Sequence, residues 1–345
     1  MEESKDTAKI FFYMKIGDNV SHKERNLGID LLKAWMSFEV VLCHYGFGSD
    51  ELVYKYFFSY FKSMAVPVFM IISFYLFARF ILCKEINIEK LGKRLQRIYT
   101  PLVSWAIIYW VVYNLFSVKK LALSDFGWQI LAGHSYNCPM WFNVVLALLT
   151  ILFFFLCKYS RFHIVVIILV SLIAIILSTS GLNNISMSLR PELCYSIGRI
   201  AEMIPYAGFG LILYKCRSDK KKSLLVIFVL LITFTGKFCR GLYCSDIISY
   251  HYSSLKLFMC STILVIIFLY IQLRYLPNIA KKILLFLSCY SMGVYCIHIL
   301  VGTMLSIIGM TLPPFYFSVF IYLLSLLLCY TISIFPYKLL KNIVM

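Results

Sequence analysis

One apolar stretch near the start of the chain holds more ionisable side chains than a membrane helix usually contains. Residues 30 to 44 have the composition of a membrane-spanning helix, yet they include Asp30, Lys33, Glu39 and His44. Ionisable groups inside a bilayer are costly, and they are usually functional. At about 100° per residue, Lys33 and His44 return to nearly the same helix face, about 16 Å apart along it. This stretch therefore indicates where the chemistry of the protein takes place.

The composition places the chain among membrane proteins. Apolar residues make up 61% of it, against about 45–50% in soluble domains. Because a bilayer core needs about 20 apolar residues per helix, the sequence predicts an all-α, polytopic integral membrane protein with about ten transmembrane helices. The predicted spans are 29–47, 60–82, 98–117, 140–157, 162–179, 193–214, 223–240, 256–273, 283–302 and 316–336.

The basic residues follow the predicted topology. The net charge of +17 is spread over short runs between the apolar spans, so we assign it to topology and anionic headgroups, not to nucleic acid. With the N-terminus inside, 23 Lys and Arg fall on the inner side and eight on the outer side. We therefore expect both termini in the cytoplasm. The expected parts are a cytoplasmic segment (1–28), the membrane domain (29–336) and a short cytoplasmic tail (337–345).

Motifs of soluble enzymes do not occur in the sequence. Most of the 12 cysteines fall inside apolar spans, where Cys behaves as a small hydrophobe. No CxxC pair and no ligand spacing of histidines occurs, so we expect no metal site. GxGxxG, Walker and GxSxG motifs are also absent, and we expect no permanently bound cofactor.

Several polar groups on different predicted helices share the outer half of the membrane. In the predicted topology Glu39 lies near mid-membrane, and His44 and His298 lie at one depth farther out. If their helices are neighbours, these groups line one outward-leaning polar cavity together with Trp141, Asn143, Arg199 and Glu202.

Each of these groups also has a simpler structural interpretation. His44 fits a hydrogen-bonded interfacial histidine, and Lys33 fits a side chain that extends its amine to the headgroups. Arg199 and Glu202, three residues apart, fit an intrahelical ion pair, and Trp141 fits an interfacial anchor. Arg94 and Arg97 lie where topology alone calls for positive charge, although Arg at i and i+3 also presents two planar forks to phosphate.

Five ordered pieces of sequence extend from residue 25 to about residue 300. They are 25–33 followed by His44, then 66–73, 94–97, 141–142 and 290–298. In order and spacing they resemble the acyltransferase-3 family of bacterial membrane O-acyltransferases, most nearly its shorter members that modify surface polysaccharides. The resemblance implies that His44 matches the family's essential histidine, that Arg94 and Arg97 match its cytoplasmic Arg-x-x-Arg pair, and that Trp141 matches the tryptophan opening helix four.

The chain departs from the family pattern at three places. Lys33 stands where the family often has Arg, which keeps the charge but loses the bidentate fork. Phe74 follows Ser73 where a Gly is usual. The Glu-Glu pair that follows the tryptophan in many longer members is absent after Trp141.

The resemblance implies a membrane O-acyltransferase, an O-acetyltransferase, in the bacterial cytoplasmic membrane. Acyl-CoA, with acetyl as the expected acyl group, would approach from the cytoplasm as co-substrate, its phosphates held by Arg94 and Arg97 with Lys93 and Lys33. His44 would act as general base or carry the acyl group as an acyl-imidazole. Glu39 and His298 are the candidates for assisting it, although Glu39 is about 140° around the helix from His44.

The expected acceptor is a sugar hydroxyl on a surface glycan or a lipid-linked precursor. Trp141, Asn143, Arg199 and Glu202 are its candidate binding residues, and outer loops at about 118–139 and 241–255 add aromatic and polar side chains such as Trp128 and Tyr252. Two other functions fit the same sequence: a transporter of a polysaccharide or lipid-linked sugar, and a non-catalytic partner in glycan assembly.

Overall fold

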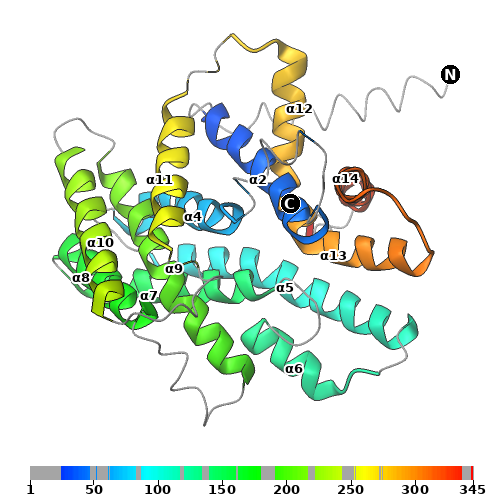
Figure 1. Ribbon diagram of the computed structural model, residues 1–345, viewed down its shortest axis with the longest axis horizontal. Helices are drawn as coiled ribbons and strands as arrows, with labels where there is room; N and C mark the ends of the chain where they lie inside the picture. The colour runs from blue at the N-terminus through cyan, green and yellow to red at the C-terminus, as the bar shows by residue number, and fades with distance from the viewer. Residues whose placement is uncertain are drawn as a thin grey trace.

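The described part of the chain contains helices and no strands in the computed structural model (Figure 1). The structure describes residues 25–46, 52, 61, 63–82, 87–116, 120–133, 140–160, 162–179, 191–216, 222–242, 252, 254–271, 273, 275–335 and 343–344. Its helices are α2 (Leu27–Tyr45), α4 (Ala65–Ile81), α5 (Ile88–Phe116), α6 (Leu123–Ala132), α7 (Trp141–Tyr159), α8 (His163–Thr179), α9 (Pro191–Lys215), α10 (Lys222–Leu242), α11 (Leu255–Tyr270), α12 (Asn278–Cys289), α13 (Ser291–Ile307) and α14 (Pro314–Ile334).

The helices agree with a multi-pass membrane protein. Each predicted span overlaps one helix, or in one case the pair α12 and α13. By length and composition, α5, α7 and α14 qualify as membrane spans, and α12 with α13 qualifies as a bent fourth, while α4, α11 and stretches of α8 and α10 are apolar but shorter. The number of ten spans, the cytoplasmic termini and the segment boundaries stay predictions. Most of segment 1–28 and of tail 337–345 lies outside the described residues.

Helix α2 lies at the centre of one half of the molecule. Asn26 caps it by accepting a hydrogen bond from the Ile29 amide at 3.1 Å, which satisfies one of the free N–H groups of the first turn. The helix packs against α4, α11, α12, α13 and α14. Because Asp30, Lys33 and Glu39 lie within it, α2 is not among the helices that qualify as spans by composition. Five other helices therefore surround the charged side chains of α2.

The span predicted at 283–302 is not one continuous helix. It breaks at Tyr290, and α12 and α13 meet there at 61°. Ser288, at the end of α12, donates to Asp30 of α2 at 2.6 Å. The contact holds α12 on the first turn of α2, while α13 continues at a different angle and packs against α5 and α14. A hydrophobicity pattern does not report such a bend, because both halves are apolar.

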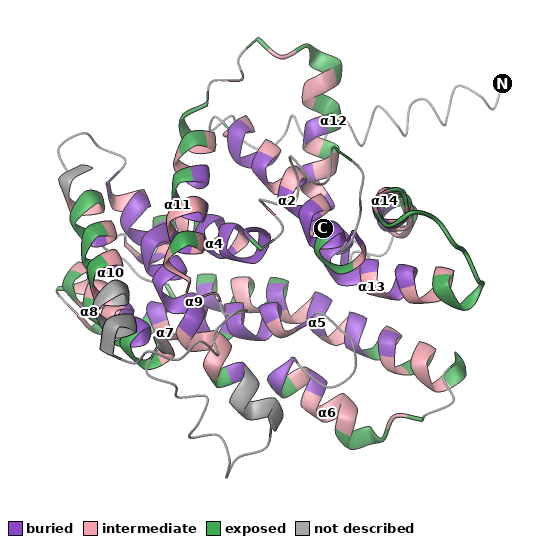
Figure 2. Ribbon diagram, in the orientation of Figure 1, coloured by how far each residue is buried: buried purple, intermediate pink, exposed green. Residues whose placement is uncertain are grey.

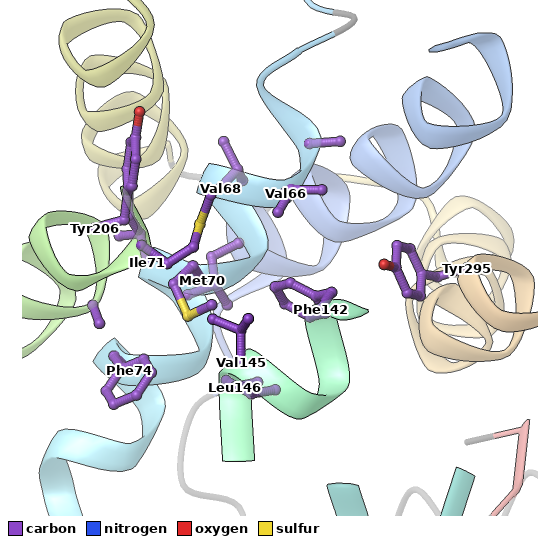
Figure 3. Packing of buried hydrophobic residues seen from close by; sticks show 14 of the residues in the cluster. Val66, Val68, Met70, Ile71, Phe74, Phe142, Val145, Leu146, Tyr206 and Tyr295 are labelled. Atoms are coloured by element: carbon purple, nitrogen blue, oxygen red, sulfur yellow. The ribbon is translucent and has the colours of Figure 1, made fainter. Parts of the chain in front are cut away.

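The remaining helices form a second group around α9. Helices α8, α9 and α10 pack together, and α4 joins them to α2 through its long contact with α9 (Figure 1). Buried positions concentrate where the groups meet, whereas α10 and much of α8 show exposed faces (Figure 2). Figure 3 shows this core, where side chains of α4 lie beside those of α7 and α9; among them are Val68, Met70, Ile71, Phe74, Val145, Leu146 and Tyr206.

Candidate active site

Two histidines from distant parts of the sequence lie side by side. The ring centroids of His44, in the last turn of α2, and His298, in the middle of α13, are 5.1 Å apart. His44 is exposed, whereas His298 is fully buried, at 0% exposure. An accessible imidazole is therefore backed by a second imidazole in the protein interior.

Backbone contacts determine the proton position on His298. Its Nδ1 lies 3.1 Å from the Val294 carbonyl oxygen and 2.8 Å from that of Tyr295. Because carbonyl oxygens only accept hydrogen bonds, Nδ1 carries the proton, and in the neutral ring Nε2 is the acceptor. This Nε2 is buried and has no hydrogen-bond partner among the residues that the structure describes. His298 thus offers an unused acceptor nitrogen on a ring that adjoins His44.

A close approach of α2 to α13 sets the separation of the two rings. The Tyr45 hydroxyl donates to the Ile299 carbonyl oxygen at 3.2 Å. A Cβ at Gly302 would overlap the end of the Tyr45 ring, so glycine at this position leaves the space that the ring occupies. The residues that follow His44 and His298 in sequence therefore hold the pair together.

Glu39 lies away from the histidines. Its Oε1 accepts a hydrogen bond from Trp35 Nε1 at 2.9 Å, and Trp35 packs against Phe61 and Phe268 at 4.6 and 5.7 Å between ring centroids. No hydrogen bond or ion pair joins Glu39 to His44 in the described part of the chain. Its assisting role stays a prediction.

The opposite end of α2 holds a compact charged cluster. The Arg25 guanidinium donates to both oxygens of Asp30, at 2.7 and 2.9 Å, and Ser288 adds the third bond described above. The carboxylate of Asp30, by hydrogen bonding to it, raises the pKa of Arg25 above its ordinary value. Lys33 is half-buried three residues farther along the helix. This cluster is an anchor between α2 and α12, with Lys33 beside it.

The predicted phosphate-binding cations do not point in one direction. Arg94 turns into the protein, where its Nη2 donates to Ser73 Oγ at 2.8 Å and its Nε to Thr150 Oγ1 at 3.2 Å. Its guanidinium carbon also lies 4.1 Å from the centroid of the Phe77 ring. Arg97 is exposed, and Lys93 pairs with Glu89 at 2.5 Å.

No carboxylate lies within ion-pair distance of Arg94 among the described residues. Arg94 is thus held by hydroxyls and aromatic rings, and its guanidinium matches the geometry of an anion such as phosphate. Ser73 and Arg94 belong to two of the sequence pieces on which the family resemblance rests. Their direct contact was not visible in the sequence.

Three of the four residues predicted to bind the acceptor sugar lie together in one cluster. They are Trp141, Arg199 and Glu202. Arg199 Nη1 donates to Glu202 Oε2 at 2.8 Å, and its guanidinium carbon lies 5.3 Å from the Trp141 ring centroid. Tyr252 joins them, with its ring centroid 4.9 Å from the same carbon. Glu202 and Tyr252 also line a hollow with Ser178, Tyr206 and Phe258. Asn143 is buried beside Met140, with 3.8 Å from Nδ2 to Sδ.

Aromatic rings connect this cluster to the histidine pair. Successive centroids lie 6.4 Å apart from Trp141 to Phe142, 5.5 Å from Phe142 to Tyr295, and 6.2 Å from Tyr295 to His298. Figure 3 shows Phe142 and Tyr295 facing each other across α7 and α13. Sequence reasoning did not assign Tyr295 a role, although its position three residues before His298 on the same helix was a usable signal.

The described residues include no group of three His, Cys, Asp or Glu side chains that could hold a metal ion. The arrangement presents the exposed imidazole of His44 and the buried acceptor nitrogen of His298 beside it. At a separate place in the bundle it presents the guanidinium of Arg94, which no described carboxylate contacts. These are suitable parts for general base catalysis with an anionic substrate.

A comparison with protein families agrees with this chemistry. A family model for acyltransferase-3, described as an acyltransferase domain, matches residues 26–334, which is nearly the whole chain. Neither a curated protein nor a solved structure matches the chain.

Proposed function

The chain belongs to the acyltransferase-3 family, and we propose that it moves an acyl group, acetyl in the first instance, from cytoplasmic acyl-CoA to a sugar hydroxyl. The acceptor in this proposal is a surface glycan or its lipid-linked precursor, and the location is the cytoplasmic membrane of a bacterium. The observation that carries the proposal is the exposed His44 ring placed 5.1 Å from the buried His298 ring.

The proposed reaction uses His44 as the general base. Its neutral imidazole, which is available near neutral pH, takes the proton of the acceptor hydroxyl as the oxygen attacks the thioester carbonyl. The new C–O bond forms and the C–S bond breaks. CoA leaves as a thiolate and takes the proton from His44, so that the histidine returns to its starting state.

The donor would bind through the cations on the other side of the bundle. Arg94 supports this part of the proposal because no described carboxylate neutralises it, and phosphate is the anion whose geometry a guanidinium matches. Arg97, Lys93 and Lys33 would add charge around the nucleotide. A pantetheine arm would then cover much of the distance of about 16 Å along α2 from Lys33 to His44.

The acceptor would meet the cluster of Trp141, Arg199, Glu202 and Tyr252. Aromatic rings stack on the apolar faces of sugars, and the Arg199–Glu202 pair offers both donors and acceptors to hydroxyl groups. Ring contacts through Phe142 and Tyr295 connect this cluster to His298, beside the proposed base.

The test compares the surface glycans of cells that produce the wild-type protein, His44→Ala or His163→Ala. Mass spectrometry of the glycans reports the mass of one acyl ester, and purified protein with radiolabelled acetyl-CoA reports transfer directly. We expect His44→Ala to lose about two to four powers of ten in transfer while inserting normally. His163, at the start of α8, is the matched control and should keep full activity.

The same experiment separates the competing functions. A transporter would leave glycan inside the cell, and its loss would remove no ester from the glycan that still reaches the surface. A non-catalytic assembly partner would be needed for glycan formation, yet His44→Ala would have no effect. Either result would overturn the proposal.

A further inference from the structure

The hydroxyl of Tyr109 makes hydrogen bonds to the backbone of α13 at the turn that contains His298. Tyr109 lies in α5 and is fully buried, at 0% exposure. Its Oη donates to the Cys296 carbonyl oxygen at 2.9 Å and accepts a hydrogen bond from the Leu300 amide at 3.0 Å. In a regular α-helix these two backbone groups, four residues apart, bond to each other. The phenol therefore binds both backbone groups of one turn of α13.

These two hydrogen bonds attach this turn of α13 to α5. His298 lies midway between the two backbone groups that Tyr109 bonds, so the hydroxyl acts on the segment that orients this ring. The same turn accepts the Tyr45 hydroxyl at Ile299. Two neighbouring helices, α5 and α2, thus define the backbone position of His298.

The His298 ring has one orientation that suits proton transfer. Its Nδ1–H is taken by the Val294 and Tyr295 carbonyls, and its Nε2 is buried with no described partner. The neighbouring His44 ring is a source of an N–H for this nitrogen. A hydrogen bond from His44 to Nε2 would leave the other nitrogen of His44 unprotonated, as a base needs to be.

We propose that Tyr109 is a positioning residue of the acyl transfer, which acts by holding the α13 turn so that His298 Nε2 accepts an N–H from His44. This inference rests on the proposed function. His298 keeps its own proton on Nδ1 throughout and stabilises the imidazolium that forms when His44 takes the acceptor proton, in the manner of the third member of a catalytic triad. The proton then passes from His44 to the departing thiolate, so no other reactant is required.

The first test is Tyr109→Phe, which keeps the ring and removes the hydroxyl. Cys296 and Leu300 are partners within a regular helix, so the variant keeps their backbone groups satisfied while it removes the attachment of this turn to α5. We expect kcat for transfer from acetyl-CoA to fall about ten- to hundred-fold, the size of effect expected when a reacting group is displaced by about 1 Å. The KM for acetyl-CoA should not change, because the donor cations lie elsewhere. Tyr159→Phe, at an exposed position at the end of α7, is the matched control and should behave as wild type.

A double-mutant cycle distinguishes positioning from general structural support. Since Tyr109 acts through His298, Tyr109→Phe should have no further effect in a His298→Ala background. An equal loss in both backgrounds would overturn the proposal, and so would a wild-type kcat in the single variant. If instead the wild-type protein transfers no acyl group, the proposed function itself fails. This result is distinguishable from a failure of the role of Tyr109, in which the wild-type protein is active.

Discussion

The two ends of α2 hold their polar groups in opposite states. In the first turn, Asp30 is 4% exposed and accepts two hydrogen bonds from Arg25 and one from Ser288. In the last turn, the exposed His44 adjoins His298, whose Nε2 has no partner in the described part of the chain. Satisfied buried groups fix a structure, whereas an unsatisfied one is available for a proton or a ligand. The comparison indicates that α2 is anchored at one end, while the other end holds the histidine that we propose as the base.

The largest expected effect at the reactive end, beyond that of His44 itself, is that of His298→Ala. It removes the nitrogen behind His44, and we expect transfer per folded molecule to fall about hundred-fold, measured with radiolabelled acetyl-CoA on purified protein. Ser288→Ala, at the anchored end, is the control and should retain turnover. Full activity of His298→Ala would end the distinction between the two ends.

Gly302→Ala tests the spacing of the two histidines. The added methyl group meets the end of the Tyr45 ring, so this ring must shift and its hydrogen bond to the Ile299 carbonyl oxygen is disturbed. We expect a loss of about 1–3 kcal/mol in the free energy of unfolding and about a ten-fold loss of transfer per folded molecule.

Gly92→Ala serves as the control for this variant because nothing lies within 4 Å of the added atom. It should leave the stability equal or slightly higher, since Ala is the better helix former. Unchanged transfer in Gly302→Ala would show that the approach of α2 to α13 does not set the reactive geometry.

Asp30→Ala tests the anchored end. It removes three charge-assisted hydrogen bonds, and we expect a loss of about 1–3 kcal/mol in the free energy of unfolding. Thermal unfolding in detergent measures this loss. Turnover per folded molecule should stay at the wild-type level. The raised pKa of Arg25 means that its guanidinium loses its proton only above the ordinary pKa of arginine. The contact between Arg25 and Asp30 should therefore persist as the pH rises through the alkaline range. A turnover defect without a stability defect would assign chemistry to this end as well.

The smallest effect belongs to Glu89→Gln. Glu89 and Lys93 form an ion pair across one helical turn, and both side chains are about two-thirds exposed. Exposed ion pairs contribute little, so the unfolding temperature should not change measurably. A clear drop would mean that exposure does not distinguish this pair from the partly buried Arg25–Asp30 pair.

Local features of the site were predictable to different degrees. The Arg199–Glu202 pair follows from a spacing of three residues on one helix, and the angle between Glu39 and His44 follows from helical geometry. By contrast, the inward turn of Arg94 toward Ser73 and Thr150 depends on where α4 and α7 lie. The two hydrogen bonds of the Tyr109 hydroxyl to α13 join residues more than 180 positions apart.

The pattern of apolar and ionisable residues is enough to identify a helical membrane protein and the apolar helix with buried charge, because a bilayer requires long apolar helices and penalises each ionisable group within them. The contact of α2 with α13, which brings His44 to His298, 254 positions later in the chain, is visible in the folded molecule alone. Apolar helices contact lipid as favourably as they contact one another, so close packing at residues such as Gly302 and interhelical hydrogen bonds select their neighbours.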